Sequence, residues 1–212
     1  MKGHSTAMLT PKASEAKNRI VRAAVALFAR QGFRGTSTRE IARLADVSEV
    51  TIFRYFEHKD DIFWCALESS FDAIRPRLNT LVRSDRLESP EVMLPEIISV
   101  LVDMATLSPE LMRLIAVALL ELRGRGEAIC RENLTPLFTA ITHYLTRTIE
   151  KGRVRNVDPA LVTAAIALTV MAQPELAKLI EGNPLAVLDS RQAINTYSSF
   201  WMDVLIPEPA AT

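Results

Sequence analysis

The sequence predicts an all-α fold of about nine helices, and three observations support this prediction. Apolar residues recur at spacings of three and four along most of the chain, as they do on the buried face of a helix. No segment sustains the alternation of period two that a half-buried strand requires. Proline and glycine stand where helices are expected to begin and end, as at Pro90, Pro109, Gly152 and Pro159.

Composition is ordinary, but charge is unevenly divided. Of 212 residues, 49% are hydrophobic and 24% are charged, as in globular proteins generally, and the net charge is zero. Residues 1–60 carry 11 Lys and Arg against 6 Asp and Glu, whereas residues 61–212 carry 14 against 19. A basic module joined to an acidic one suits a protein that contacts phosphate at one end only.

Several classes of protein find no support in the sequence. The N-terminus lacks the apolar segment of a signal peptide, and the longest uncharged stretch, 159–174, is shorter than the ~20 residues that span a bilayer. Cys65 and Cys130 form neither a metal-binding spacing nor a disulfide framework. There is no phosphate loop, zinc-protease motif or nucleophile elbow. We therefore expect a soluble cytoplasmic protein without catalytic residues, cofactor, metal ion or membrane partner.

The N-terminal domain is expected to begin after a disordered arm, residues 1–13, and to occupy residues 14–58. Its first helix is predicted from Ser14 to Gly32. An apolar stripe along this helix is formed by Ile20, Ala24, Leu27 and Phe28.

Two short capped helices are predicted next. Ser37 and Glu40 have the spacing of a capping box, Asp46 tolerates the left-handed backbone of a turn, and Ser48 caps the second helix. The pattern places one set of residues on the inner face of that helix: Val50, Phe53 and Phe56. The outward set is Glu49, Thr51, Ile52, Arg54 and Tyr55. Two capped helices joined by a short turn form a helix-turn-helix, whose second helix enters the DNA major groove.

A longer run of residues adds to this pattern. The segments are Gly32-Phe33, Thr36-Ser37-Thr38, Glu40-Ile41-Ala42, Val47-Ser48, Thr51-Ile52-Phe53, Tyr55-Phe56 and Lys59-Asp60-Asp61-Ile62. Together they resemble, without gaps over residues 14–64, the TetR family of bacterial transcriptional regulators. Two positions depart from the family pattern: Phe53 stands where tyrosine is usual, and Asp46 where glycine is usual.

The resemblance and the motif geometry together predict the DNA contacts. Residues early in the second motif helix are expected near base edges, where Thr can contact a thymine methyl and Arg can bind guanine. This set is Glu49, Thr51, Ile52 and Arg54. Expected phosphate contacts are Thr36, Thr38, Arg39, Ser48, Tyr55 and Lys59.

The remainder, residues 59–212, is expected to form a helical ligand-binding and dimerisation domain. Its helices are predicted from about Lys59, with a kink or end at Pro76, and then over 91–107, 109–124, 127–151, 159–173 and 185–205.

Family resemblance implies a small-molecule site among the helices of this domain and a twofold dimer built on the last two helices. Candidate ligand contacts are Trp64, Phe71, Met93, Met104, Met112, Phe138, His143 and Tyr144. The helix over 160–172 is apolar nearly all round, so it must be covered on several sides. The predicted dimer interface is Leu161, Ala165, Leu168, Ile194, Tyr197 and Trp201.

These observations predict a ligand-responsive, homodimeric transcriptional repressor that leaves a palindromic double-stranded DNA operator when a small-molecule inducer binds. Two alternatives keep the same fold. One is an activator or an inducer-independent DNA-binding protein, which a C-terminal domain without a cavity would favour. The other is a scaffold protein that has lost specific DNA binding, which weak binding without salt dependence would favour.

Overall fold

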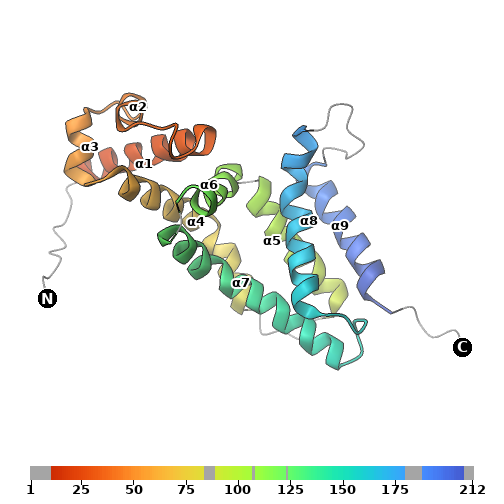
Figure 1. The fold of residues 1–212 in the computed structure, drawn as a ribbon. Coiled ribbons are helices and arrows are strands. Elements are labelled where there is room, and N and C mark those ends of the chain that lie inside the picture. The colour runs from red at the N-terminus through yellow and green to blue at the C-terminus, as the bar shows by residue number, and fades with distance from the viewer. Residues whose placement is uncertain (1–10, 84–88, 107, 123, 180–187, 208–212) are drawn as a thin grey trace, which may run out of the picture. The chain divides into compact units, whose positions relative to one another are not determined.

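The computed structural model describes residues 11–83, 89–106, 108–122, 124–179 and 188–207, and every regular element in these ranges is an α-helix. Figure 1 shows the nine helices of this described part. They are α1 (Pro11–Gln31), α2 (Thr38–Leu44), α3 (Glu49–Tyr55), α4 (Lys59–Arg83), α5 (Pro90–Thr106), α6 (Pro109–Leu120), α7 (Arg125–Glu150), α8 (Pro159–Leu179) and α9 (Ser190–Leu205). The predicted all-α fold is confirmed.

The chain divides into two compact units, which do not follow a single cut in the sequence. The first unit contains residues 1–70 and 113–127, and the second contains residues 71–112 and 128–212. The division therefore falls within α4, and a segment from the later part of the chain belongs to the first unit. The predicted domain boundary at residue 58 differs from this division and stays a prediction about where the DNA-binding domain ends.

The core of the first unit forms where α1 covers α2 and α3. The predicted stripe on α1 is buried throughout, from Ile20 to Phe28. Phe28 packs edge-on against Phe63 of α4, with ring centroids 5.1 Å apart, and Phe33 stacks on Phe28 at 5.7 Å. These aromatic contacts join α1 to α4.

Local signals set the turn between α2 and α3. The Ser37 hydroxyl accepts from the Glu40 amide at 3.2 Å, and the Glu40 carboxylate accepts from the Ser37 amide at 2.9 Å, which is the predicted capping box. Asp46 has φ 53°, the left-handed conformation predicted for it. The Ser48 hydroxyl accepts from the Thr51 amide at 3.1 Å and so begins α3 as predicted.

In the second unit, α5 is the central helix. It is buried over most of its length and packs against α8 and α9, which lie beside it in Figure 1. Of the charged side chains on α5, Asp103 is the buried one, and its carboxylate forms an ion pair with Arg77 of α4.

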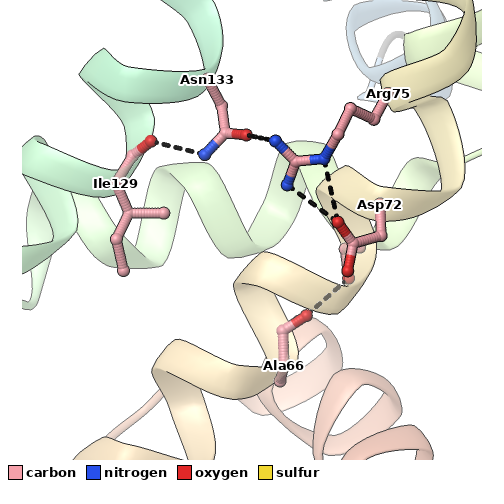
Figure 2. A network of polar contacts seen from close by, with 6 residues as sticks. Ala66, Asp72, Arg75, Ile129 and Asn133 are labelled. Atoms are coloured by element: carbon pink, nitrogen blue, oxygen red, sulfur yellow. Dashed lines mark hydrogen bonds and ion pairs between the residues drawn. The ribbon is translucent and has the colours of Figure 1, made fainter.

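A polar network joins α4 to α7 within the second unit (Figure 2). The Arg75 guanidinium lies 2.8 Å from the Asp72 carboxylate and donates to the Asn133 side-chain oxygen at 3.0 Å. Asn133 in turn donates to the Ile129 carbonyl one turn earlier in α7, at 2.9 Å. Two side chains thus fix the orientation of one arginine, and Ile129 in turn fixes the orientation of Asn133.

Several helix boundaries differ from the predicted ones. The first helix begins at Pro11, inside the expected disordered arm; residues 1–10 lie outside the described part. Pro76 does not end α4, which continues to Arg83, and α6 ends at Leu120 rather than near residue 124. At α9, Asp189 provides a capping box with Gln192 and sets the start, whereas the predicted start at residue 185 lies outside the described residues.

None of the described helices is by itself long and apolar enough to cross a bilayer; α5 and α6 pass on length and composition only when taken as a bent pair.

Candidate nucleic-acid interface

The exposed face of α3 differs from the predicted one. Ile52 is completely buried, so the prediction that it contacts base edges is wrong. Val50 and Phe53, predicted to face inward, are 79% and 52% exposed. Two sets of apolar residues could form the buried face of this seven-residue helix, because both have helical spacing: Val50 with Phe53 and Phe56, or Ile52 with Phe56. In the structure the second set is buried. The outward face consists of Glu49, Val50, Phe53 and Arg54.

Hydroxyl and carboxylate groups fix the start of α3. The Ser48 and Thr51 hydroxyls lie 2.8 Å apart, and the Thr38 hydroxyl donates to the Glu49 carboxylate at 2.5 Å, which joins α2 to α3. The same polar groups that were predicted to contact DNA therefore also hold each other, and this pre-orders the surface that α2 and α3 present.

The capping box at the start of α2 includes the carboxylate of Glu40, whose pKa is lowered. Hydrogen bonds from the Ser37 amide and hydroxyl lower the pKa of Glu40 below its usual 4.5, because they favour the ionised carboxylate. At neutral pH, α2 thus begins with a charged, hydrogen-bonded acid.

Two predicted phosphate contacts lie inside the first unit instead. Thr36 is buried, and its hydroxyl donates to the Gly32 carbonyl at 2.8 Å. The Lys59 ammonium donates to the carbonyls of Phe33 and Thr36 at 2.9 and 3.0 Å and lies 4.1 Å from the Phe33 ring centre. The phosphate role predicted for the Thr36 side chain is wrong because that side chain is buried. Lys59 is occupied in holding the connection between α1 and α2.

The remaining predicted contacts lie at or near the surface. Arg39 and Arg54 are exposed, and Arg43, which the prediction omitted, is exposed on α2 as well. A shallow groove on this side is lined by Arg39, Glu40, Ala42, Arg43, Val47 and Glu49. Arg54 donates to the half-buried Tyr55 hydroxyl at 3.2 Å and lies 5.3 Å from its ring. Exposed guanidinium groups of this kind suit a polyanion.

Within the first unit, the segment 113–127 contacts the N-terminal residues through side chains that no local sequence pattern identifies. The Glu121 carboxylate accepts from the Arg34 amide at 3.0 Å, and a Cβ on Gly32, which has φ +74°, would lie 2.6 Å from the same carboxylate. Arg125 lies 3.6 Å from the Asp61 carboxylate and 5.7 Å from the Trp64 ring centre. At Gly126 a Cβ would lie 2.9 Å from the Ala118 carbonyl oxygen. A close fit therefore joins this segment to the connection between α1 and α2 and to the first turns of α4.

A cavity of about 430 Å³ lies in the second unit. Its lining combines apolar and polar side chains: Leu81, Val82, Ile97, Ala140, Ile141, His143, Tyr144, Thr146, Arg147 and Glu150. His143 and Tyr144 are thus brought to one cavity, as the predicted ligand set supposed. The other predicted ligand residues do not line it; Phe71, Met93 and Met104 are buried core residues, Met112 and Phe138 are half-buried, and Trp64 belongs to the first unit. Arg147 and Glu150, one and two helical turns beyond His143, were not predicted because no sequence motif marks them.

An exposed apolar stripe follows α8. Leu161 and Leu168 are 68% and 67% exposed, and the half-buried Ala165 lies between them. On α9, Phe200 and Val204 are also exposed, whereas Trp201 is buried within this one chain. Of the predicted interface, Leu161, Ala165 and Leu168 therefore form a surface, Ile194 and Tyr197 are half-buried, and the Tyr197 hydroxyl donates to the Thr169 carbonyl of α8. The placement of Trp201 at the interface is wrong, because its ring packs inward and Phe200 takes the outward position.

Similar proteins share this helix-turn-helix. The family model for bacterial regulatory proteins of the tetR family matches residues 20–64. The HTH-type transcriptional repressor NicS of Pseudomonas putida is 28% identical over 170 residues, 78% of this chain and 77% of that protein. The HTH-type transcriptional regulator HbdR of Aromatoleum sp. is 41% identical over 58 residues, 27% of this chain and 25% of its own length.

Solved structures share the fold over nearly the whole chain. A bacterial regulatory protein of the tetR family from Rhodococcus RHA1 superposes with a TM-score of 0.75 at 18% identity, over 91% of this chain and 98% of that one. AibR, in a complex with isovaleryl coenzyme A and operator DNA, superposes with a TM-score of 0.72 at 17% identity, over 87% of this chain and 97% of its own.

Proposed function

Because this chain belongs to the TetR family of bacterial transcriptional regulators, we propose that it is a cytoplasmic repressor that binds a palindromic operator as a homodimer. A small molecule bound in the second unit lowers its affinity for DNA. The protein acts through binding and not through catalysis.

The surface of α2 and α3 supports the DNA-binding part of this proposal. The capping box, the Ser48 cap and the bond between Thr38 and Glu49 hold α3 before DNA arrives, so little ordering is required on binding. Arg54 and Glu49 lie on its exposed face, with Arg39 and Arg43 beside them on α2. Base edges and phosphates would be contacted by this one surface.

The cavity in the second unit supports the ligand-responsive part. Its volume of about 430 Å³ suits a small organic molecule, and its lining mixes aliphatic side chains with His143, Arg147 and Glu150. A cavity also weighs against the inducer-independent alternative. A ligand that prefers one conformation by about 2.7 kcal/mol would lower DNA affinity ~100-fold.

The apolar stripe on α8 supports the homodimer. Two copies of this surface related by a twofold axis would cover it and would present two α3 helices to two half-sites.

Selection from a random duplex library with the purified chain tests the proposal. We expect a palindrome with two half-sites, and Arg54→Ala should weaken binding about 10- to 100-fold without changing the melting temperature of the protein, because the guanidinium is exposed. Recovery of no common sequence at either of two salt concentrations would contradict the repressor.

A further inference from the structure

Two apolar side chains occupy the middle of the exposed face of α3. Val50 and Phe53 are one helical turn apart, so they point to the same side, and 79% and 52% of their surfaces are exposed. Single exposed apolar residues are common and do not by themselves indicate a binding surface. Here, however, two of them are adjacent on the helix that faces DNA, between the charged side chains of Glu49 and Arg54.

Buried residues on the opposite face of α3 fix the orientation of Val50 and Phe53. Ile52 is fully buried between the two residues in sequence, and Phe56 is buried at the end of the helix, so α3 cannot roll to hide Val50 and Phe53 without exposing both. The Ser48 cap fixes the helix start at the other end. The apolar pair therefore remains outward, and a molecule that covers the exposed face of α3 contacts it.

A duplex offers one matching group in its major groove. Base edges there present hydrogen-bond donors and acceptors, and the C5-methyl of thymine is the apolar exception. Valine has no polar atom to offer these edges, and Phe53 lacks a hydroxyl that would bind a phosphate or a base. Opposite a cytosine amino group, either side chain would remove water without replacing its hydrogen bond.

Charge around the pair favours nucleic acid over an apolar protein partner. Arg39, Arg43 and Arg54 are exposed on the same two helices, and residues 1–60 carry 11 basic against 6 acidic side chains. These surroundings complement phosphates on both sides of a groove.

We propose that Val50 and Phe53 determine operator specificity by contacting thymine C5-methyl groups, so that each half-site carries thymine at the positions opposite these two side chains. The proposal rests on the DNA-binding function above and deepens it. Burial of one methyl against an apolar side chain corresponds to about a fourfold change in affinity, and burial of four such methyls across two half-sites corresponds to roughly 250-fold.

Uracil differs from thymine only by this methyl, so the test uses base analogues in an operator obtained by selection. Each thymine of the two half-sites is replaced by deoxyuridine, and the affinity of the wild-type chain is measured by fluorescence anisotropy. We expect symmetric pairs of positions at which removal of the methyl weakens binding about fourfold per methyl. Deoxyuridine outside the half-sites should change nothing.

Variants then assign the methyl groups to residues. Val50→Ala and Phe53→Ala should each bind the thymine operator more weakly and lose sensitivity to uracil at one symmetric pair of positions. Val92→Ala, at an α5 residue that is 52% exposed like Phe53, is the matched control and should keep the wild-type pattern.

The outcomes separate the two proposals. A specific operator whose affinity is indifferent to uracil at every half-site position would overturn methyl recognition and leave the repressor standing. Absence of any specific operator would overturn the repressor itself. The experiment with the wild-type chain does not depend on the folding of the variants, and a melting curve of each variant checks that separately.

Discussion

Two of the exposed apolar surfaces in the described part of the chain, on α3 and on α8, are similar in exposure and differ in their surroundings. Val50 and Phe53 form a small pair with glutamate and arginine on either side. Leu161 and Leu168 lie on a helix that carries no charged side chain from residue 160 to residue 172. The first surface therefore suits a polar partner with occasional apolar groups, whereas the second suits a continuous apolar one.

The comparison shows that exposure alone does not identify a partner. Val50 and Phe53 on α3 are suited to contact the isolated thymine methyl groups that lie among hydrogen-bonding base edges. A broad neutral stripe gains from contact with another such stripe, and a second copy of α8 supplies it. The charged residues next to an exposed apolar side chain indicate its kind of partner, which its exposed fraction alone does not.

The largest effect should follow from placing charge on the α8 surface. We expect Leu161→Glu combined with Leu168→Glu to produce monomers and to weaken operator binding roughly 10²–10⁴-fold, because the two half-sites would no longer be bound as one unit. Analytical ultracentrifugation and anisotropy measure the two effects. Val92→Glu adds a charge at another exposed apolar residue of the second unit and should leave a dimer. A dimeric double variant would remove α8 from the interface.

A second prediction separates the two faces of α3. Ile52→Ala deletes a fully buried side chain and should lower the free energy of unfolding by about 2–5 kcal/mol, since the cavity cannot collapse completely. Val50→Ala, two positions earlier and exposed, should change it by less than about 0.5 kcal/mol. Urea denaturation of both variants tests this. Equal effects would mean that the buried face of α3 has been assigned incorrectly.

How far the sequence could predict these faces depends on the range of the contacts involved. Caps at Ser37 and Ser48 and the turn at Asp46 involve neighbours three residues away or less, and they were predicted correctly. The buried face of α3 was not, because seven residues do not distinguish two helical spacings.

Long-range contacts escaped prediction altogether. Lys59 was predicted to contact phosphate, but its ammonium donates to the carbonyls of Phe33 and Thr36, which are more than 20 residues away in sequence. The contact of Glu121 with Arg34 joins residues 87 apart in sequence and has no local signature. For the same reason, the cavity residues near His143 could not be chosen from among the many apolar positions of the helices.

A third, smaller effect should arise at Glu121. Removing its carboxylate leaves the Arg34 amide without this acceptor, and we expect Glu121→Ala to reduce the free energy of unfolding by about 1 kcal/mol. Operator affinity should fall as well, because the connection between α1 and α2 loses a support. Glu127→Ala, at an exposed position of the same segment, is the control. Identical melting curves and affinities for the two variants would rule out a structural role for Glu121.

The smallest effect concerns the pH dependence of the capping box. The folded pKa of Glu40 is lowered by its bonds to Ser37, so its contribution to stability is present above the unfolded pKa of 4.5 and is lost as the pH falls through the folded value. Melting temperatures of the wild type and Glu40→Gln, measured from about pH 7 to pH 3, should therefore converge in acid. A constant difference between them would contradict the role of the carboxylate charge.

Recognition of one DNA sequence by this chain is measured most simply by comparing two duplexes. Anisotropy titrations compare the selected palindrome with a scrambled duplex of the same composition at about 0.15 M salt. We expect at least ~10³-fold tighter binding to the palindrome, and a linear decrease of log affinity with log salt for both duplexes. Equal affinity for the two duplexes would contradict it.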